Sequence, residues 1–152
     1  MAGWTNRGKY TIIGNVFRKN AMPTNVYVAM VTSAIAPTAD TNVLGDLTEI
    51  AAGNGYTTGG YQLAMNATDF DVHTEDDALD RGYLQIKDVV WTAAGGSIPA
   101  SGNGARYAVL TDDNVTVASR IIYCYWDLGS DKSVSVGNTI TLQNLEMRAN
   151  ES

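Results

Sequence analysis

Four short apolar runs in this chain have the spacing of β-strands. They cover residues 26–31, 82–91, 106–110 and 121–126. Gly, Asn and Asp are frequent in the segments between them, and these residues favour tight turns. A chain of 152 residues has about the length of one domain and can bury a core without disulfides or metals. The pattern therefore predicts an all-β fold, an antiparallel β-sandwich of jelly-roll type.

A short helix is predicted before the first strand. Tyr10, Ile13 and Phe17 recur at intervals of three and four residues, as apolar residues do along one face of a helix. Thr5 and Asn6 precede them, and either residue type is able to cap a first turn. The predicted fold is thus a sandwich with a short N-terminal helix.

Charge is distributed unevenly along the chain. No acid precedes Asp40, so the first 39 residues carry +4; the total is −6, and the remainder therefore carries −10. The four bases are Arg7, Lys9, Arg18 and Lys19. They either dock onto an acidic surface, such as a neighbouring subunit, or form an ordinary solvated helix face. We divide the chain into an N-terminal basic helix or arm, residues 1–24, and a β-sandwich domain, residues 25–152.

The partners that composition disfavours are nucleic acid and membrane. Phosphate contacts need a concentrated basic surface, which an acidic body does not offer. No stretch is apolar enough to cross a membrane, and the N-terminus lacks the apolar core of a signal peptide. We therefore expect synthesis in the cytoplasm. Cys124, the single cysteine, lies in an apolar run and is predicted to be an unreactive core residue.

Two strands change the face on which their apolar residues lie. Leu84 and Ile86 share one face, whereas Val89 falls on the other, with the change around residues 87–88. The last strand repeats this change around residues 143–144. An extra residue in each strand, a β-bulge, would restore the phase. Two such bulges favour a curved, strongly twisted sandwich.

A long connection after the first strand carries aromatic residues among glycines. Tyr56 and Tyr61 lie in this connection, and its glycines permit positive φ angles. A connection of this length is usually a binding or assembly loop. We expect Tyr56 and Tyr61 to be contact residues. With Trp4, they also suggest an alternative, an exposed aromatic platform for glycans.

The acidic segment at residues 69–80 is the only concentration of chemistry-bearing side chains, with His73 among them. Its spacing lacks the glycine and terminal glutamate of a helix–loop–helix calcium site, so we interpret it as a solvated acidic loop. We predict no metal, no cofactor and no enzymatic activity. One alternative from another class stays open, a carbohydrate-active enzyme that uses two of these carboxylates. The candidate carboxylates are Asp69, Asp71, Glu75 and Asp77.

Four segments, in this order and spacing, resemble small structural proteins of tailed bacteriophages. The segments are YVAMVTSA at residues 27–34, LTEIAAGNGY at 47–56, ARYAVLTD at 105–112 and VGNTITL at 136–142. The resemblance extends from Asn25 to Arg148. It implies a virion component that coats or stabilises the head, or one that lies in the tail or a fibre base.

These observations together predict a decoration or cement protein that binds the major capsid protein in the virion, after synthesis in the host cytoplasm. A homotrimer is expected, because cyclic symmetry matches the sites that a lattice offers. The alternative is a tail or fibre protein that contacts the host surface. The predicted contact residues are Arg7, Lys9, Arg18, Lys19, Tyr56 and Tyr61.

Overall fold

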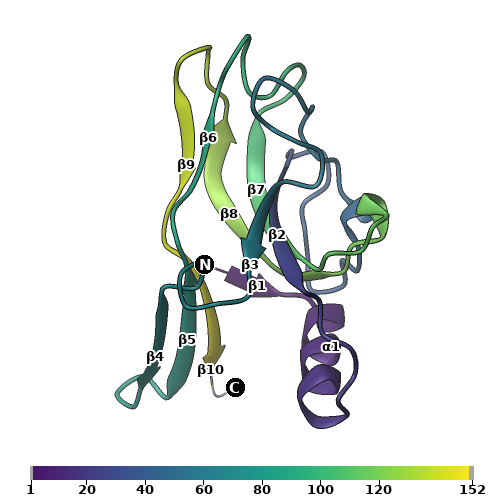
Figure 1. Cartoon of the computed structure of the whole chain (residues 1–152), viewed down its shortest axis with the longest axis vertical. Helices are drawn as coiled ribbons and strands as arrows, with labels where there is room; N and C mark the ends of the chain where they lie inside the picture. The colour runs from purple at the N-terminus through teal and green to yellow at the C-terminus, as the bar shows by residue number, and fades with distance from the viewer. Residues whose placement is uncertain (1, 151–152) are drawn as a thin grey trace.

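The computed structural model describes residues 2–150, which form mainly antiparallel strands and, within that range, one α-helix (Figure 1). The large sheet has the spatial order β1 (Ala2–Trp4), β8 (Ile122–Lys132), β7 (Ala105–Thr111), β2 (Asn25–Val31), β3 (Tyr61–Ala64). The helix is α1 (Asn6–Phe17), and two 3-10 turns are η1 (Leu44–Asp46) and η2 (Val117–Ser119). The predicted all-β class and the short N-terminal helix are confirmed.

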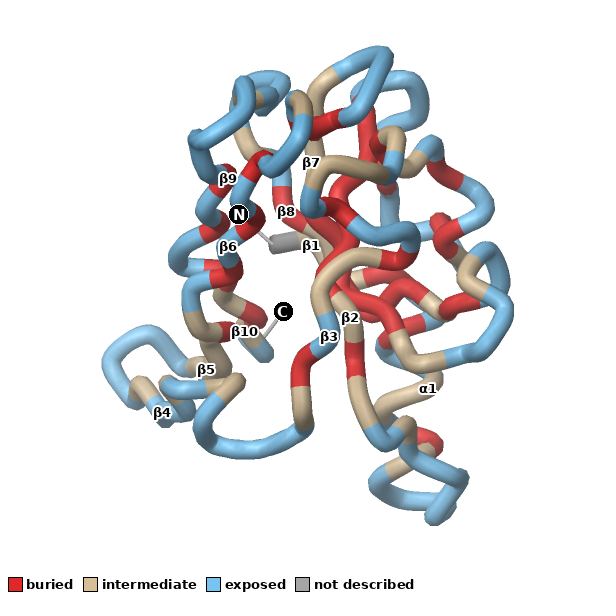
Figure 2. The backbone as a smooth tube through the Cα atoms, turned by 45° about the horizontal axis from the view of Figure 1, so that its top comes forward, coloured by how far each residue is buried: buried red, intermediate tan, exposed pale blue. Residues whose placement is uncertain are grey.

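The remaining strands form a second group that faces the large sheet. Its members are β10 (Leu145–Asn150), β5 (Arg81–Ile86) and β4 (Val72–Asp76) in one sheet, with β6 (Val89–Thr92) and β9 (Thr139–Leu142) as a pair. Val28 and Met30 from the large sheet share one buried cluster with Ile86 and Val89 from the second group. Figure 2 shows these buried segments as red stretches of the tube. The main core therefore joins the two groups of strands.

A smaller core lies on the opposite face of the large sheet. Ala29 and Val31 of β2 pack there with Leu44 of η1 and Ile122 of β8. Neighbouring residues of β2 consequently point into two different cores, and the strand is buried on both faces. This explains its nearly continuous apolar sequence.

The change of phase in the second group is matched on both strands. Ile86 pairs with Leu145, and the next pair begins with Val89 opposite Leu142. The chain advances three residues on each side, so neither strand contains an extra residue. The predicted β-bulges are therefore wrong. Both strands are interrupted at the same level, where Asn144 takes a left-handed conformation with φ 56°, and the apolar side chains change phase together.

Two tryptophans connect β10 to the large sheet. The indole N–H of Trp4 donates to the carbonyl oxygen of Arg148 at 2.7 Å, and that of Trp126 donates to Glu146 at 2.9 Å. Both carbonyls belong to β10, whose hydrogen-bonded neighbour in its own sheet is β5. The indoles thus satisfy backbone acceptors on the free edge of β10 and hold the two groups of strands together at this end of the molecule.

Candidate assembly surface

Helix α1 is attached to the large sheet by its backbone and by small residues. The hydroxyl of the buried Thr5 accepts a hydrogen bond from the N–H of Gly8 at 2.8 Å and caps the helix. A Cβ at Gly8 would lie 2.6 Å from the Cα of Tyr123 in β8, so only glycine allows this approach. Because β1 pairs with β8 immediately before the cap, the rotation of the helix about its axis is fixed at its start.

This rotation turns the apolar stripe of the helix outward. Tyr10, Ile13 and Phe17 are 65%, 58% and 79% exposed, and Val16 beside them is 60% exposed. We call these four residues the α1 stripe. The spacing that predicts the helix is therefore the spacing of a solvent-facing surface. An apolar stripe of this kind, continuous over about two turns, marks an interaction surface on a folded protein.

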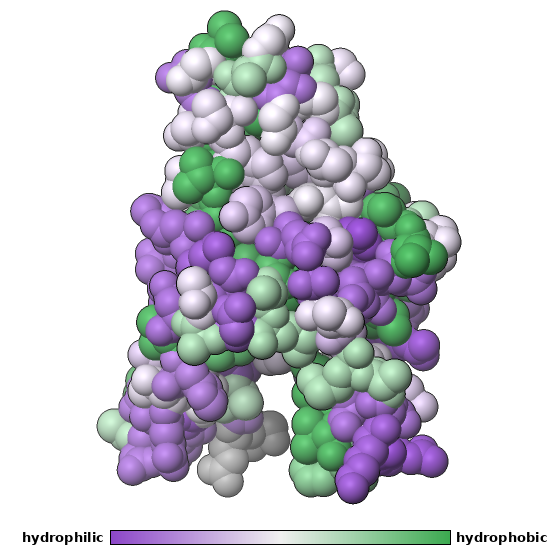
Figure 3. Space-filling model, in the orientation of Figure 1, coloured by the Kyte–Doolittle hydropathy of each residue, from purple (hydrophilic) through white to green (hydrophobic). Residues whose placement is uncertain are grey.

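Four exposed cations surround the α1 stripe. The guanidinium of Arg7 lies 5.7 Å from the ring centre of Tyr10. No carboxylate in residues 2–150 forms an ion pair with any of the four, which are Arg7, Lys9, Arg18 and Lys19. The predicted basic segment is thus an exposed patch that combines positive charge with apolar area. Figure 3 shows α1 as one of two projections at the lower end of the molecule.

An apolar groove of about 490 Å³ lies between α1 and the second group of strands. It is the open end of the main core, because the buried Val26 and Met147 contribute to its lining. In the space-filling view, a notch separates the α1 projection from the one formed by β4 and β5 (Figure 3). The apolar side chains that line it include Trp4, Ile12, Val26, Phe70, Leu84 and Met147.

The acidic segment forms a hairpin. Strands β4 and β5 pair from Val72 opposite Gln85 to Asp76 opposite Arg81, and residues 77–80 form the turn. The predicted loop is therefore wrong as secondary structure, because five of these residues belong to strand β4. We call β4, β5 and the turn between them the acidic hairpin.

Two carboxylates of the acidic segment have cation partners. Asp76 pairs with Arg81 at 3.0 Å. Asp69 lies 2.5 Å from Lys87 and accepts the N–H of Ala64 at 2.7 Å. The Lys87 ammonium lowers the pKa of Asp69, and the carboxylate in turn raises the pKa of Lys87. The other carboxylates of the hairpin and its flank are exposed, and no cation in residues 2–150 pairs with them; they are Asp71, Glu75, Asp77 and Asp80.

The candidate catalytic carboxylates do not enclose a cavity. Asp71, Glu75 and Asp77 are exposed on the hairpin and its flank, and Asp69 is engaged by Lys87. His73 is exposed at the edge of the apolar groove. Within residues 2–150, no group of three or more His, Cys, Asp or Glu side chains is arranged to hold a metal ion.

Tyr56 is part of the core. Its side chain is 2% exposed, and its hydroxyl donates to Glu49 at 2.7 Å while it accepts the N–H of Met30 at 3.0 Å. Burial raises the pKa of Glu49, although hydrogen bonds from Tyr56 and from the N–H of Gly59 act in the opposite direction. The prediction that Tyr56 is a contact residue is therefore wrong, because its ring and hydroxyl are both committed to the interior.

Tyr61 is half-buried beside the core. Its ring meets that of Trp91 edge-on at 6.1 Å between centres, and the ammonium of Lys87 lies 5.5 Å from it. With Tyr56 buried and the indole N–H of Trp4 directed to β10, these three aromatic residues do not present a common exposed platform.

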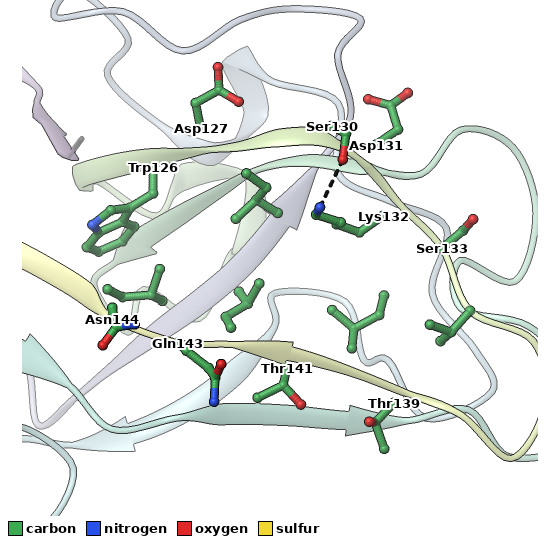
Figure 4. Close-up of a pocket in the computed structure, with 15 residues that line it drawn as sticks. Trp126, Asp127, Ser130, Asp131, Lys132, Ser133, Thr139, Thr141, Gln143 and Asn144 are labelled. Carbon is green, nitrogen blue, oxygen red and sulfur yellow. Dashed lines mark hydrogen bonds between the residues drawn. The ribbon is translucent and has the colours of Figure 1, made fainter.

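A further hollow, of about 650 Å³, lies between β8 and β9 (Figure 4). Four of its polar side chains, Asp127, Ser130, Lys132 and Gln143, form hydrogen bonds to other residues of the chain. Asp127 accepts two hydrogen bonds from Arg106, at 2.8 and 3.0 Å, and the amide of Gln143 donates to Asp88 at 3.0 Å. The ammonium of Lys132 donates to the hydroxyl of a nearby serine, as Figure 4 shows. These groups do not converge on a point where a ligand would bind.

Cys124 is buried in β8, and burial raises the pKa of its thiol. The predicted core position is confirmed. No helix in the described part of the chain is both long and apolar enough to cross a membrane. Comparison with protein-family models, with curated proteins and with solved structures found no match.

The sequence contained the residues of the α1 stripe but not their orientation. Gly8 was a signal of this orientation, because a glycine inside a predicted helix indicates either a less stable helix or a close approach to another backbone. Only the structure distinguishes these two interpretations.

Proposed function

We propose that this chain is a non-enzymatic structural protein of a bacteriophage virion that binds and stabilises the capsid lattice as a decoration or cement protein. The observation that carries the proposal is the α1 stripe with its four flanking cations. Apolar area of this extent, left uncovered on a folded chain, is suited to an assembly contact. The resemblance of four segments to phage structural proteins supports the virion as the place of assembly.

The proposed partner is the major capsid protein, and the proposed oligomer is a trimer of β-sandwiches of jelly-roll type. Binding to the assembled shell and not to its separated subunits stabilises the shell by mass action. A contact of standard size on each copy is sufficient, because the effect is multiplied over the lattice. The contact residues of this proposal are the α1 stripe, Arg7, Lys9, Arg18, Lys19 and the half-buried Tyr61.

The experiment that tests the proposal is a copy-number measurement on purified particles by quantitative mass spectrometry. A ratio to the major shell protein near one, or near a simple fraction, is the expected result. A few copies per particle would favour the tail or fibre alternative. Absence of the chain from particles would overturn the proposal and favour the alternative of a carbohydrate-active enzyme that uses carboxylates of the acidic segment.

A second measurement connects the proposal to α1. The variant Phe17→Asp places a charge at the C-terminal end of the stripe, and we expect it to be missing from particles although it folds. Lys132→Glu is the matched control, since this exposed lysine lies at the far end of β8 from the helix. Equal incorporation of Phe17→Asp and the natural chain would remove α1 from the assembly surface.

A further inference from the structure

We infer that the α1 surface of one copy docks against the acidic hairpin and apolar groove of a second copy of this chain. The inference rests on the proposed assembly function and assigns the α1 surface to the contact between copies within the proposed oligomer. It follows from the two projections at the lower end of the molecule, which Figure 3 shows on either side of the notch. The α1 projection carries the four cations and the other carries the carboxylates of the acidic hairpin.

The charges on the two projections balance in number. Four cations surround the α1 stripe, and four carboxylates of the acidic segment have no ion-pair partner in residues 2–150. No acidic residue lies within the first 39 residues, so the helix carries no carboxylate that would compensate its charge internally. Opposite charges placed across a contact accelerate association and select the correct partner.

The apolar surfaces also correspond. The stripe presents two aromatic and two aliphatic side chains, and the groove is lined by residues such as Phe70, Leu84 and Met147. Docking would cover both, whereas the folded single chain leaves both in contact with solvent. Burial of apolar area supplies the free energy, and the charges fix the orientation.

The two surfaces have similar lengths. A helix of 12 residues is about 18 Å long at about 1.5 Å per residue. Strand β4 has 5 residues and spans about 17 Å at about 3.3 Å per residue. Several cations of the helix are therefore able to face carboxylates of the hairpin at the same time.

We place the contact between chains. In one chain, α1 lies on one side of the notch and the acidic hairpin on the other (Figure 1). The phase of the helix is fixed by β1 and by the approach of Gly8 to β8. Ile13 borders a hollow of about 430 Å³ that lies between α1 and Arg148 and Ala149 of β10, whereas Tyr10, Val16 and Phe17 do not line it. A second copy brings its own hairpin to the stripe. Repetition of this contact around an axis gives a closed oligomer, a dimer or a ring.

Sedimentation equilibrium of the full chain tests the inference. We expect self-association at micromolar concentration. The double variants Arg7→Glu/Lys9→Glu and Glu75→Lys/Asp77→Lys each place like charges across the contact, and each should raise the dissociation constant about 100-fold.

Combining the four substitutions in one chain restores opposite charges, so we expect association to return to within about tenfold of the natural chain. Rescue of this kind excludes misfolding as the cause of the earlier loss. Lys132→Glu is the control for a change of net charge and should associate like the natural chain. Phe17→Asp should be monomeric, and it should stay monomeric when combined with the four substitutions, because it removes apolar area.

A natural chain that stays monomeric at about 100 µM would overturn the inference, and so would association that the charge variants leave unchanged. Neither result bears on the copy number in particles. A monomer found in simple ratio to the shell protein overturns only self-docking, whereas an oligomer that is absent from particles overturns only the virion function.

Discussion

The loop that carries Tyr56 and the helix α1 are both fixed to the large sheet, but by different parts of the chain. Tyr56 inserts its ring into the core and connects its hydroxyl to Glu49 and to the backbone of Met30. Helix α1 is fixed by the cap at Thr5 and by the close backbone approach at Gly8. One region is attached through a large side chain, and the other through the backbone.

This difference determines what each region has left for a partner. The side chain that fixes the loop is used up inside the fold, so Tyr56 contributes nothing to the surface. The helix packs one partly buried apolar side chain, Ile12, against the main core, and its aromatic residues remain outside. Attachment through the backbone therefore makes a stable element available as an interface. If the two modes of attachment are distinct, substitutions at the helix backbone contact and at the Tyr56 side chain should lower stability, whereas substitutions of the exposed stripe should not.

The largest effect is expected at the backbone contact of the helix. Gly8→Ala would place a methyl group 2.6 Å from the Cα of Tyr123, and a strand backbone cannot move aside as a side chain does. We expect the free energy of unfolding to fall by about 3 kcal/mol, the upper part of the range for overpacking. Urea unfolding followed by tryptophan fluorescence measures this change.

Gly14→Ala is the matched control on the same helix. A Cβ at Gly14 meets the end of the flexible Asn20 side chain, which is exposed and free to move. The substitution should leave stability unchanged or raise it by up to about 1 kcal/mol through helix propensity. Similar losses at both glycines would mean that the helix is not held by the approach of Gly8 to β8.

The second effect concerns the side-chain attachment of the loop. Tyr56→Phe removes a hydroxyl that satisfies the buried N–H of Met30 and a carboxylate oxygen of Glu49. We expect a loss of about 2 kcal/mol in the free energy of unfolding, because a buried donor is left without an acceptor. Tyr10→Phe, on the exposed stripe, should change stability by less than about 0.5 kcal/mol. Equal losses of stability in the two variants would show that the Tyr56 hydroxyl does not fix the loop more strongly than the exposed Tyr10 hydroxyl fixes the helix.

The sequence predicts the helix and the strands better than it predicts which of their faces are buried. Residue spacing indicated the helix around Tyr10, Ile13 and Phe17 because three- and four-residue intervals are a local property of the chain. The direction in which that face points depends on the pairing of β1 with β8, a contact between segments more than one hundred residues apart. No local pattern contains that information.

The candidate site shows the same limit. The four cations were identified from composition, and all of them are exposed. The position of Tyr56 after glycines in a long connection predicts a surface residue, yet its hydroxyl has buried partners at Glu49 and Met30. The apolar pattern shows the phase changes near residues 87–88 and 143–144, but it predicts a bulge in each strand separately. Pairing between the two strands makes a matched interruption possible, and pairing is not visible in either strand alone.

A third prediction uses pH to separate the loop from the helix. Burial raises the pKa of Glu49 in the folded chain above its ordinary value of 4.5. A folded state with the higher pKa binds more protons than the unfolded state, so stability falls as pH rises from about 4.5 through the raised pKa. Glu49→Gln should remove this contribution. The variant keeps an acceptor for the Tyr56 hydroxyl.

The measurement is urea unfolding of both proteins between about pH 4 and pH 7, a range that begins near the ordinary carboxyl pKa and extends above it. Relative to Glu49→Gln, the natural chain should lose stability across this range. Asp112, whose pKa is also raised by burial, is present in both proteins and cancels in the difference. A difference that is independent of pH would show that the Glu49 carboxyl has the same pKa in the folded and unfolded states.

The smallest effect on the free energy of unfolding is expected at Phe17, the more exposed of the two aromatic residues of the stripe. Phe17 is 79% exposed, so Phe17→Ser removes little buried area and should change the free energy of unfolding by less than about 0.5 kcal/mol. The same substitution should weaken self-association strongly, since the phenyl ring is the largest apolar group at that end of the stripe. Thermal unfolding at a concentration where the chain is monomeric isolates the first quantity, and sedimentation measures the second. A substantial loss of monomer stability would place Phe17 inside the fold, whereas unchanged stability with lost association assigns the ring to a partner.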